Sequence, residues 1–215
     1  MKSTISAIAL LLLVALPGAF SEAAVIDRIA ATIDREVITL SQIDQIVITR
    51  LIAQRPDESE DEYRRRVLNA LISQTLRYRD VQRFRIEDVS PDAIEARLRV
   101  TASRFDSEEE FVEALRRAEM TLEDARGMIR RQLQVQNYID ERFAPMIFVS
   151  LEEIETYYRD VWLPQRTSQG LPPVGLDAVR EEIRTLLRAD RLREQVEVWT
   201  NQLRASANVD IFAYR

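Results

Sequence analysis

Residues 25–44 read Val-Ile-Asp-Arg-Ile-Ala-Ala-Thr-Ile-Asp-Arg-Glu-Val-Ile-Thr-Leu-Ser-Gln-Ile-Asp. Apolar and β-branched residues alternate loosely with polar ones up to Ile33, and the pattern returns in Val37-Ile38-Thr39 after Asp34-Arg35. This pattern is typical of two strands joined by a tight turn. Ser41 then predicts the start of a helix that runs to about Gln54, because a serine hydroxyl caps the first amides of a helix. The stretch therefore predicts a β-hairpin that leads directly into a helix.

The last residues of the chain form the second strand-like segment. In residues 208–214, Val209, Ile211 and Ala213 alternate with Asp210 and Phe212. An isolated hairpin is marginally stable in water and needs a third strand or a packed helix. We therefore expect the closing strand to pair with the hairpin, so that the two ends of the chain meet in one small antiparallel sheet.

Helical periodicity fills almost all of the sequence between these strands, and capping residues mark its boundaries. Ser90-Pro91 combines a cap with proline at the first helical position. Capping boxes are expected where Ser107 precedes Glu110, Thr121 precedes Asp124 and Ser150 precedes Glu153. The fold class that this predicts is mainly α, with helices over about residues 61–84, 90–104, 107–115, 121–143 and 150–162.

Residues 163–175 differ from the rest in composition. They hold five of the nine Gly and Pro residues that follow position 23, which predicts a linker. After it, residues 176–206 carry apolar side chains three or four apart and predict one helix of roughly 45 Å. Such a stripe faces a core or a partner helix. We expect this helix to lie across the others and to deliver the last strand to the sheet.

Residues 1–23 have the three-part form of a secretory signal peptide. Lys2 gives the positive start, and the apolar run of residues 5–16 is too short to cross about 30 Å of hydrocarbon as a helix. Ser21 and Ala23 are small residues at the −3 and −1 positions of a cleavage site. The expected mature chain starts at Ala24, is exported to the periplasm and has no membrane span. Retention of the segment as an anchor is the alternative.

The composition excludes most familiar catalytic chemistry. The chain has no Cys, no His and four Gly, which excludes Cys and His zinc sites, disulfides, thiol catalysis, Ser-His-Asp triads and glycine-rich phosphate loops. Adjacent carboxylates such as Glu152-Glu153 diverge around a helix and have no nucleophile beside them. We therefore predict no catalytic residue, no metal and no cofactor. The net charge of −6 also makes nucleic acid a poor partner, and Arg64-Arg65-Arg66 fits a solvated helix face.

Residues 25–44 resemble the start of SurA-type periplasmic chaperones, in which a strand, a turn and a returning strand precede the first helix. Residues 88–94, residues 129–133 and residues 148–154 are similar to later parts of the amino-terminal region of that family. Residues 199–211 are similar to its last helix and closing strand. The resemblance implies a multi-helix chaperone core with a small sheet. It divides the chain into a signal peptide (1–23), an amino-terminal chaperone region (24–162), a linker (163–175) and a completing helix and strand (176–215).

Members of this family usually carry parvulin-type prolyl isomerase domains between the two parts of the core. Here the linker of residues 163–175 stands in that place, and the chain lacks the His and Cys of a parvulin active site. The resemblance therefore implies an ATP-independent holdase for unfolded outer-membrane or other envelope proteins, without isomerase activity. An adaptor that clasps one dedicated envelope partner and an unfamiliar envelope enzyme are the alternatives. The sequence leaves open whether two copies form a homodimer by exchanging their closing strands.

A holdase needs an apolar surface larger than that of an ordinary monomer, with adaptable side chains. Methionine and aromatic residues near the helix ends and the break at Pro145 are the candidates for such a surface. For any one of them the core is the more common place, and periodicity does not show which of them faces out. The predicted peptide-binding residues are Met120, Met128, Met146, Phe148, Tyr157, Tyr158 and Trp162.

Overall fold

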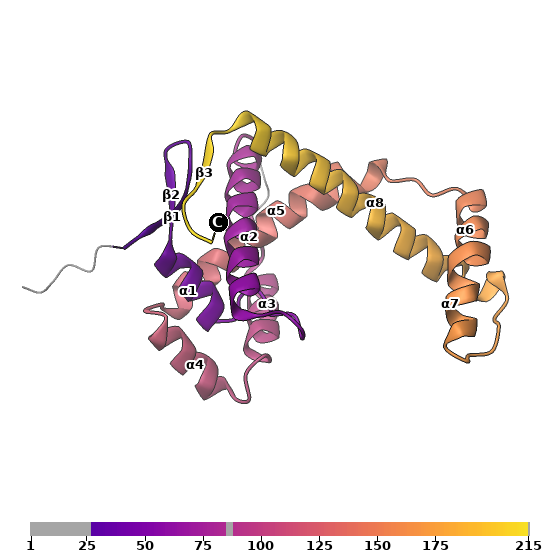
Figure 1. Ribbon diagram of the computed structural model, residues 1–215, viewed down its shortest axis with the longest axis horizontal. Coiled ribbons are helices and arrows are strands. Elements are labelled where there is room, and N and C mark those ends of the chain that lie inside the picture. Colours follow the sequence, from indigo (N-terminus) through magenta and orange to yellow (C-terminus); the bar gives the residue numbers. More distant parts are fainter. Residues whose placement is uncertain (1–26, 85–87, 215) are drawn as a thin grey trace, which may run out of the picture.

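The two ends of the chain meet in a three-stranded antiparallel sheet of order β2-β1-β3 (Figure 1). The strands are β1 (Ile29–Ile33), β2 (Glu36–Thr39) and β3 (Val209–Ile211). This computed structural model describes residues 27–84 and 88–214, so the predicted signal peptide lies outside the described residues. Ile33 pairs with Val209 and Thr32 with Asp210, which confirms the predicted pairing of the chain ends.

The turn between β1 and β2 also holds the closing strand. Asp34 has a φ of 53°, which lets the chain reverse in two residues. Its backbone N–H donates to the carbonyl of Asn208 at 2.8 Å, and its carboxylate accepts from the backbone N–H of Asn208 at 2.9 Å. Arg79 adds an ion pair to Asp34 at 2.9 Å. One short turn thus fixes the hairpin, the last strand and a long helix together.

Five helices complete the main lobe of the molecule, and capping residues begin each of them. The predicted box at Thr121 and Asp124 is confirmed, as is the box at Ser150 and Glu153 in the next part of the chain. At Ser107 the reciprocal bond differs, because Glu110 accepts from the N–H of Asp106 instead. The helices of the main lobe are α1 (Leu40–Ile48), α2 (Glu60–Val81), α3 (Pro91–Ala102), α4 (Glu108–Arg117) and α5 (Leu122–Arg142).

The first helix starts and ends earlier than the sequence predicts. Thr39 caps α1 in a capping box with Gln42, while the Ser41 hydroxyl bonds to Asp27. The helix ends at Ile48, and Arg50 takes a φ of 50°, a left-handed conformation that no helix can continue through. The predicted end near Gln54 was therefore wrong, and residues 51–59 form a loop into α2.

Two apolar cores fill much of the main lobe, and a third, with Val81 and Tyr138, lies where α2 meets α5. The first packs the sheet against α1 and α2, with Ala30, Ile33, Ile43 and Ile72 fully buried. The second lies among α3, α4 and the start of α5, and includes Ile94, Phe111 and Ile129 among others. The mainly α fold with a small sheet is confirmed.

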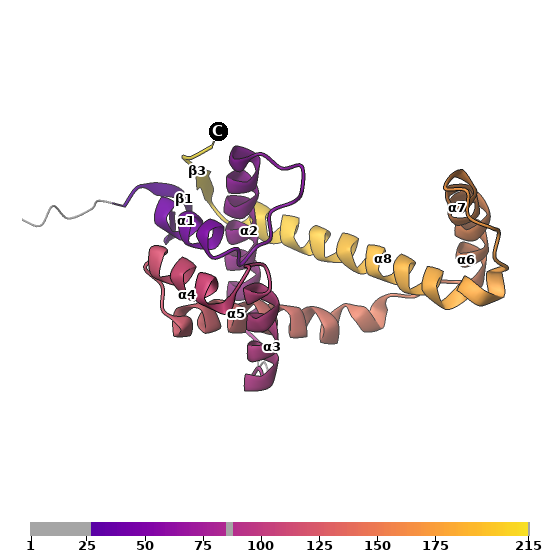
Figure 2. The same cartoon turned by 90° about the horizontal axis from the view of Figure 1, so that it is seen from below.

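A second body, which we call the arm, stands away from the main lobe (Figures 1 and 2). It consists of the connecting segment 144–150, α6 (Leu151–Tyr157), a π-helical turn η2 (Tyr158–Trp162), α7 (Leu163–Ser168) and the start of α8 (Leu176–Ser206). The connecting segment opens with the 3-10 turn η1 (Ala144–Met146). The small core of the arm contains Val149, Ile154, Val179 and Ile183. The first part of the predicted linker is thus helical, and only residues 169–175 lack helix.

The long helix α8 joins the arm to the main lobe. Its first turns pack on α6, and its last turns bury Trp199 and Thr200 against the main lobe before the chain enters β3. Thr200 accepts a hydrogen bond from the Nε of Arg77 on α2 at 2.8 Å. Between these ends, Leu186 is 40% exposed, so the predicted apolar stripe is core at its two ends only.

Candidate peptide-binding surface

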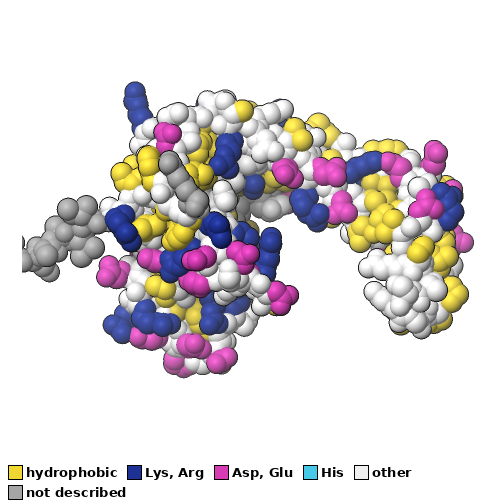
Figure 3. Space-filling model, in the orientation of Figure 1, with side chains coloured by type: hydrophobic (Ala, Val, Ile, Leu, Met, Phe, Trp, Pro, Cys, Tyr) yellow, Lys and Arg dark blue, Asp and Glu magenta, His cyan; other side chains and the backbone are white. Residues whose placement is uncertain are grey.

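The largest exposed apolar side chains of the arm are concentrated in and around the connecting segment. Phe148 is 77% exposed, Met146 63% and Leu151 51%. These values are high for such side chains, and contiguous exposed apolar surface in a monomer marks a site of interaction. Figure 3 shows hydrophobic side chains gathered where α6 and α8 meet, and open space between the arm and the main lobe. Val161, Leu171 and Leu186 add further exposed apolar residues to the arm.

Two arginines of α8 hold the connecting segment in place. Arg191 donates to the carbonyl of Phe148 and forms an ion pair with Glu153 on α6. Arg188 donates to the carbonyl of Ala144 at 3.4 Å. Fixing the backbone in this way leaves the side chain of Phe148 in solvent. The exposed aromatic ring therefore belongs to an anchored segment, which lowers the entropy lost when a partner binds.

Glu153 is the centre of this anchor. Its carboxylate accepts from the backbone N–H of Ser150 at 2.8 Å and from the Ser150 hydroxyl at 2.9 Å, and it faces Arg191. The Ser150 N–H, followed by the Arg191 guanidinium, lowers the pKa of Glu153 to about 2. The group therefore stays ionised throughout the neutral range, and the arm keeps its attachment to α8.

The structure places the seven predicted peptide-binding residues in three regions. Met120 is 7% exposed in the second core of the main lobe, and Met128 is half-buried between the two cores. Met146 and Phe148 lie exposed in the connecting segment. Tyr157, Tyr158 and Trp162 are half-buried on the arm, against its small core. The seven therefore do not share one surface, and five of them lie on the arm.

Four exposed apolar residues of the arm were not predicted. Leu151 follows the capping serine of α6, and Val161 lies in η2. Leu171 lies in the proline-containing turn, and Leu186 belongs to the stripe of α8 that was predicted as core. Periodicity alone assigns Leu186 to the core, because it does not show that the middle of α8 spans the distance between two bodies.

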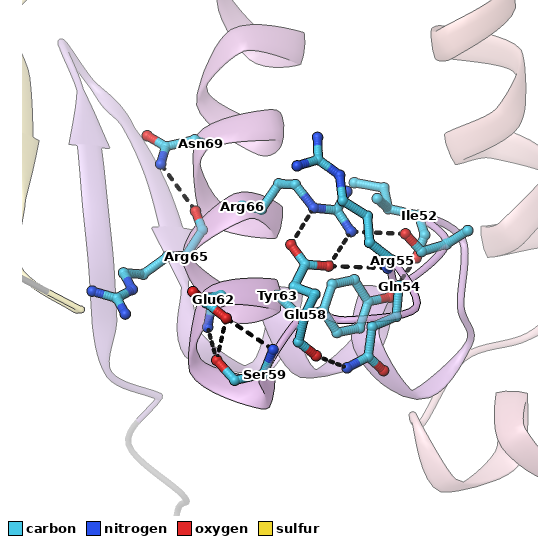
Figure 4. A network of polar contacts seen from close by, with 11 residues as sticks. Ile52, Gln54, Arg55, Glu58, Ser59, Glu62, Tyr63, Arg65, Arg66 and Asn69 are labelled. Carbon is cyan, nitrogen blue, oxygen red and sulfur yellow. Dashed lines mark hydrogen bonds and ion pairs between the residues drawn. The ribbon is translucent and has the colours of Figure 1, made fainter. Parts of the chain in front are cut away.

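A second candidate surface is a groove of about 970 Å³ along α2 in the main lobe. Its lining includes β2, α1, α2 and α5, with apolar side chains such as Val37, Leu71 and Met128 beside several arginines. One of these, Arg66, is held by Glu58 at 2.6 Å and donates to the carbonyl of Ala53 at 2.7 Å (Figure 4). The Arg66 guanidinium lowers the pKa of Glu58 to about 2. This pair therefore neutralises part of the positive charge along the groove.

In residues 27–84 and 88–214, no three His, Cys, Asp or Glu side chains come together as metal ligands. The same residues include no helix that is both long and apolar enough to span a bilayer. The arm and the groove both present apolar side chains bordered by charged and amide groups.

Comparison with known proteins identifies curated relatives of the chain. It is 31% identical over 149 residues to the chaperone SurA of Pseudomonas fluorescens strain Pf0-1, an alignment that covers 65% of this chain and 34% of that protein. The resemblance to SurA is confirmed. The SurA chaperones of Pseudomonas syringae pv. tomato (31% over 137 residues, 61% of this chain and 32% of that protein) and Pseudomonas aeruginosa (29% over 144 residues, 65% and 34%) align similarly.

The SurA-like chain spans about a third of the length of the curated relatives it matches. None of the known protein-family models matches it. Between α7 and α8 the SurA-like chain has only the turn of residues 169–175, where no further domain is inserted. The relatives therefore support a SurA-like core over the part of the chain that aligns.

Proposed function

We propose that this protein is an ATP-independent periplasmic chaperone that binds unfolded outer-membrane or other envelope proteins. The observation that carries the proposal is the anchored, solvent-exposed Phe148 on an arm that stands away from the main lobe. The curated SurA relatives support a chaperone function, and the three-part form of residues 1–23 supports export.

Binding without nucleotide requires that affinity come from contact alone. Burying an exposed apolar side chain contributes roughly 1.5–3 kcal/mol, so several residues of the arm together can hold a segment of an unfolded chain with moderate affinity. Release then follows from mass action, when the client folds and buries its own apolar residues. The abundant acidic side chains, which give a net charge of −6, keep such an apolar surface soluble.

We further propose that the protein does not isomerise prolyl bonds. The chain contains no His or Cys with which to build a parvulin active site, and residues 163–175 form a helix and a turn. A prolyl isomerase assay on a tetrapeptide substrate tests this directly. We expect the uncatalysed rate, and a rate that rises in proportion to protein concentration would contradict the proposal.

The role of the arm is tested by suppression of aggregation. The protein is added to a β-barrel outer-membrane protein as the latter is diluted from urea, and light scattering is recorded. We expect wild-type protein to suppress scattering and the double variant Met146→Ser/Phe148→Ser to lose most of this effect, since both side chains are exposed and contribute little to stability.

Val112→Ser is the matched control for this variant. Val112 is 55% exposed on α4 in the main lobe, so its substitution removes exposed apolar surface away from the arm. We expect this control to suppress aggregation as well as wild type does. Equal loss of suppression in both variants would show that the effect is not specific to the arm.

A further inference from the structure

A row of three side chains crosses the arm on one helical face. Tyr158, Trp162 and Arg166 follow each other four residues apart through η2 and α7. The rings of Tyr158 and Trp162 stack with centroids 5.7 Å apart, and the guanidinium of Arg166 lies 5.2 Å from the centroid of the Trp162 ring. The row combines two aromatic faces with two hydrogen-bond donors, the Tyr158 hydroxyl and the Arg166 guanidinium.

A segment of the chain itself lies against this row. We call it the strap, residues Leu171-Pro172-Pro173-Val174. The Tyr158 hydroxyl donates to the carbonyl of Val174 at 2.7 Å, and the Nε of Arg166 donates to the carbonyl of Pro172 at 2.7 Å. The side chain of Val174 packs on the core of the arm, whereas Leu171, Pro172 and Pro173 are exposed. The row thus binds two carbonyls two residues apart, and the apolar side chain of Val174 packs on the core beside it.

We propose that the row is a binding site for extended, proline-containing segments of an unfolded client, and that the strap occupies it as an internal ligand. This inference rests on the proposed chaperone function and names one class of segment that the arm accepts. The client segment replaces the strap and presents its own carbonyls to Tyr158 and Arg166, with an apolar side chain in the place of Val174.

The chemistry of the strap explains the class of ligand. Consecutive prolines hold an extended conformation, and their carbonyls stay free to accept hydrogen bonds because the prolines have no N–H. Aromatic grooves with a few added donors recognise such segments in other protein modules. In the strap itself, the backbone N–H of Leu171 donates to the carbonyl of Arg166 at 3.2 Å. An external segment with the same pattern can therefore take its place.

The strap competes with any client because it is tethered at both ends. A short tether gives an internal ligand an effective concentration in the millimolar range, so the wild-type site is largely filled. Loosening the strap without altering the row must therefore increase the affinity for an external peptide. A purely structural turn predicts no such increase.

The test measures fluorescence anisotropy of a labelled synthetic peptide with the strap sequence Gln-Gly-Leu-Pro-Pro-Val-Gly-Leu against the purified full chain. The variant Val174→Ser removes the apolar anchor of the strap and leaves Tyr158, Trp162 and Arg166 in place. We expect this variant to bind the peptide at least about tenfold more tightly than wild type does. Replacing both prolines of the peptide by alanine should weaken its binding to the variant.

Two matched variants control the test. Leu171→Ser changes an exposed residue of the same strap and should leave the affinity unchanged. Trp162→Leu, added to Val174→Ser, removes the centre of the row and should abolish the gain. Two results would overturn the proposal. One is equal affinity of wild type and Val174→Ser for the strap peptide, and the other is equal binding of the proline and alanine peptides to Val174→Ser.

Binding of an unfolded β-barrel protein is measured on the same samples, which separates this inference from the proposed function. If Val174→Ser fails to bind the peptide while the unfolded protein is still bound, the strap inference is wrong and the chaperone function stands. If neither the peptide nor the unfolded protein is bound by folded samples, the chaperone function itself is wrong.

Discussion

Two arginines just beyond the ends of α1 and α3 donate hydrogen bonds to each other's backbone. Arg50 donates to the carbonyl of Arg104, and Arg104 donates to the carbonyl of Arg50 and to that of Leu51 at 3.2 Å. Arg50 also lies over the ring of Phe105, 4.5 Å from its centroid. Helix carboxyl ends favour positive charge, so each guanidinium faces a group that stabilises it. This reciprocal contact joins α1 to α3 without any carboxylate.

Replacing Arg104 by Met should therefore destabilise the main lobe. Loss of charged hydrogen bonds to backbone carbonyls costs about 1–3 kcal/mol of unfolding free energy. Urea unfolding followed by circular dichroism measures the difference. Arg97→Met, which removes an exposed arginine of α3, is the control and should stay within about 0.5 kcal/mol of wild type. Equal losses in both variants would contradict the role of Arg104.

Glu153 makes the attachment of the arm sensitive to acid. Its pKa is about 2 in the folded protein and near 4.5 when the group is free, so the folded state is favoured by ionisation. The stabilisation is fully present above pH 4.5 and is lost as the pH falls towards 2. The variant Glu153→Gln should therefore be less stable than wild type at pH 7, and the difference should vanish near pH 2.

Unfolding of the two proteins in urea at pH 7, 4 and 2.5 measures this convergence. Glu152→Gln removes a neighbouring carboxylate that takes no part in the capping box or the ion pair with Arg191. It should leave the pH dependence of stability as in wild type. A constant difference between Glu153→Gln and wild type across the three pH values would contradict the role of ionisation.

Single residues differ in how far the sequence predicts their surroundings. The cap at Thr121 was predicted because its partner, Asp124, lies three residues away and the contact is local. The exposure of Phe148 was not, because it depends on Arg191, a residue far along the chain that fixes the backbone of the connecting segment. Met120 is likewise a core residue only because α3, α4 and α5 enclose it.

At the scale of elements, α8 is buried at its two ends and exposed between them. Trp199 stacks near Tyr138 and Phe143, with ring centroids 5.6 Å and 5.3 Å away, and its Nε1 donates to Asp80 at 3.1 Å. Trp199→Ala should cost about 3–5 kcal/mol of stability, as for other large core side chains. Leu186→Ala, in the exposed middle of the same helix, should cost less than about 0.5 kcal/mol. Similar losses of stability in the two variants, measured by urea unfolding, would contradict this description of α8.

The closing strand completes the sheet, and its removal is the second test at this scale. Deleting residues 209–215 removes β3 and exposes the edge of β1 that it pairs with. We expect a lower unfolding midpoint and faster hydrogen exchange of the β1 amides. An unchanged midpoint together with unchanged exchange would refute a stabilising role of the paired chain ends.

The elements were predictable wherever stability required a particular partner. An isolated hairpin cannot hold its conformation, so the pairing of β3 with β1 followed from the presence of strand patterns at both ends. The segment 163–175 was harder, because its Pro and Gly residues suggested a linker while Pro164 occupies the first turn of α7, where proline is tolerated. Its composition did not reveal that α6 continues through a π-helical turn into α7.

At the scale of the whole molecule, two bodies share one long helix. The main lobe contains the sheet and most of the helices, and the arm carries the exposed apolar residues and the strap (Figures 1 and 3). Five of the seven candidates for peptide binding lie on the arm, and Met120 and Met128 lie in the main lobe. The sequence did not predict this separation, because it depends on the length and direction of α8.

The central claim is that this core alone binds unfolded envelope proteins. The most direct test titrates the protein into a labelled β-barrel outer-membrane protein just diluted from urea and follows fluorescence anisotropy without nucleotide, with a folded soluble protein beside it. We expect saturable binding of the unfolded protein in the micromolar range or tighter, and no binding of the folded protein. Absence of binding by a sample that circular dichroism shows to be folded would contradict the chaperone function and favour an adaptor with one dedicated partner.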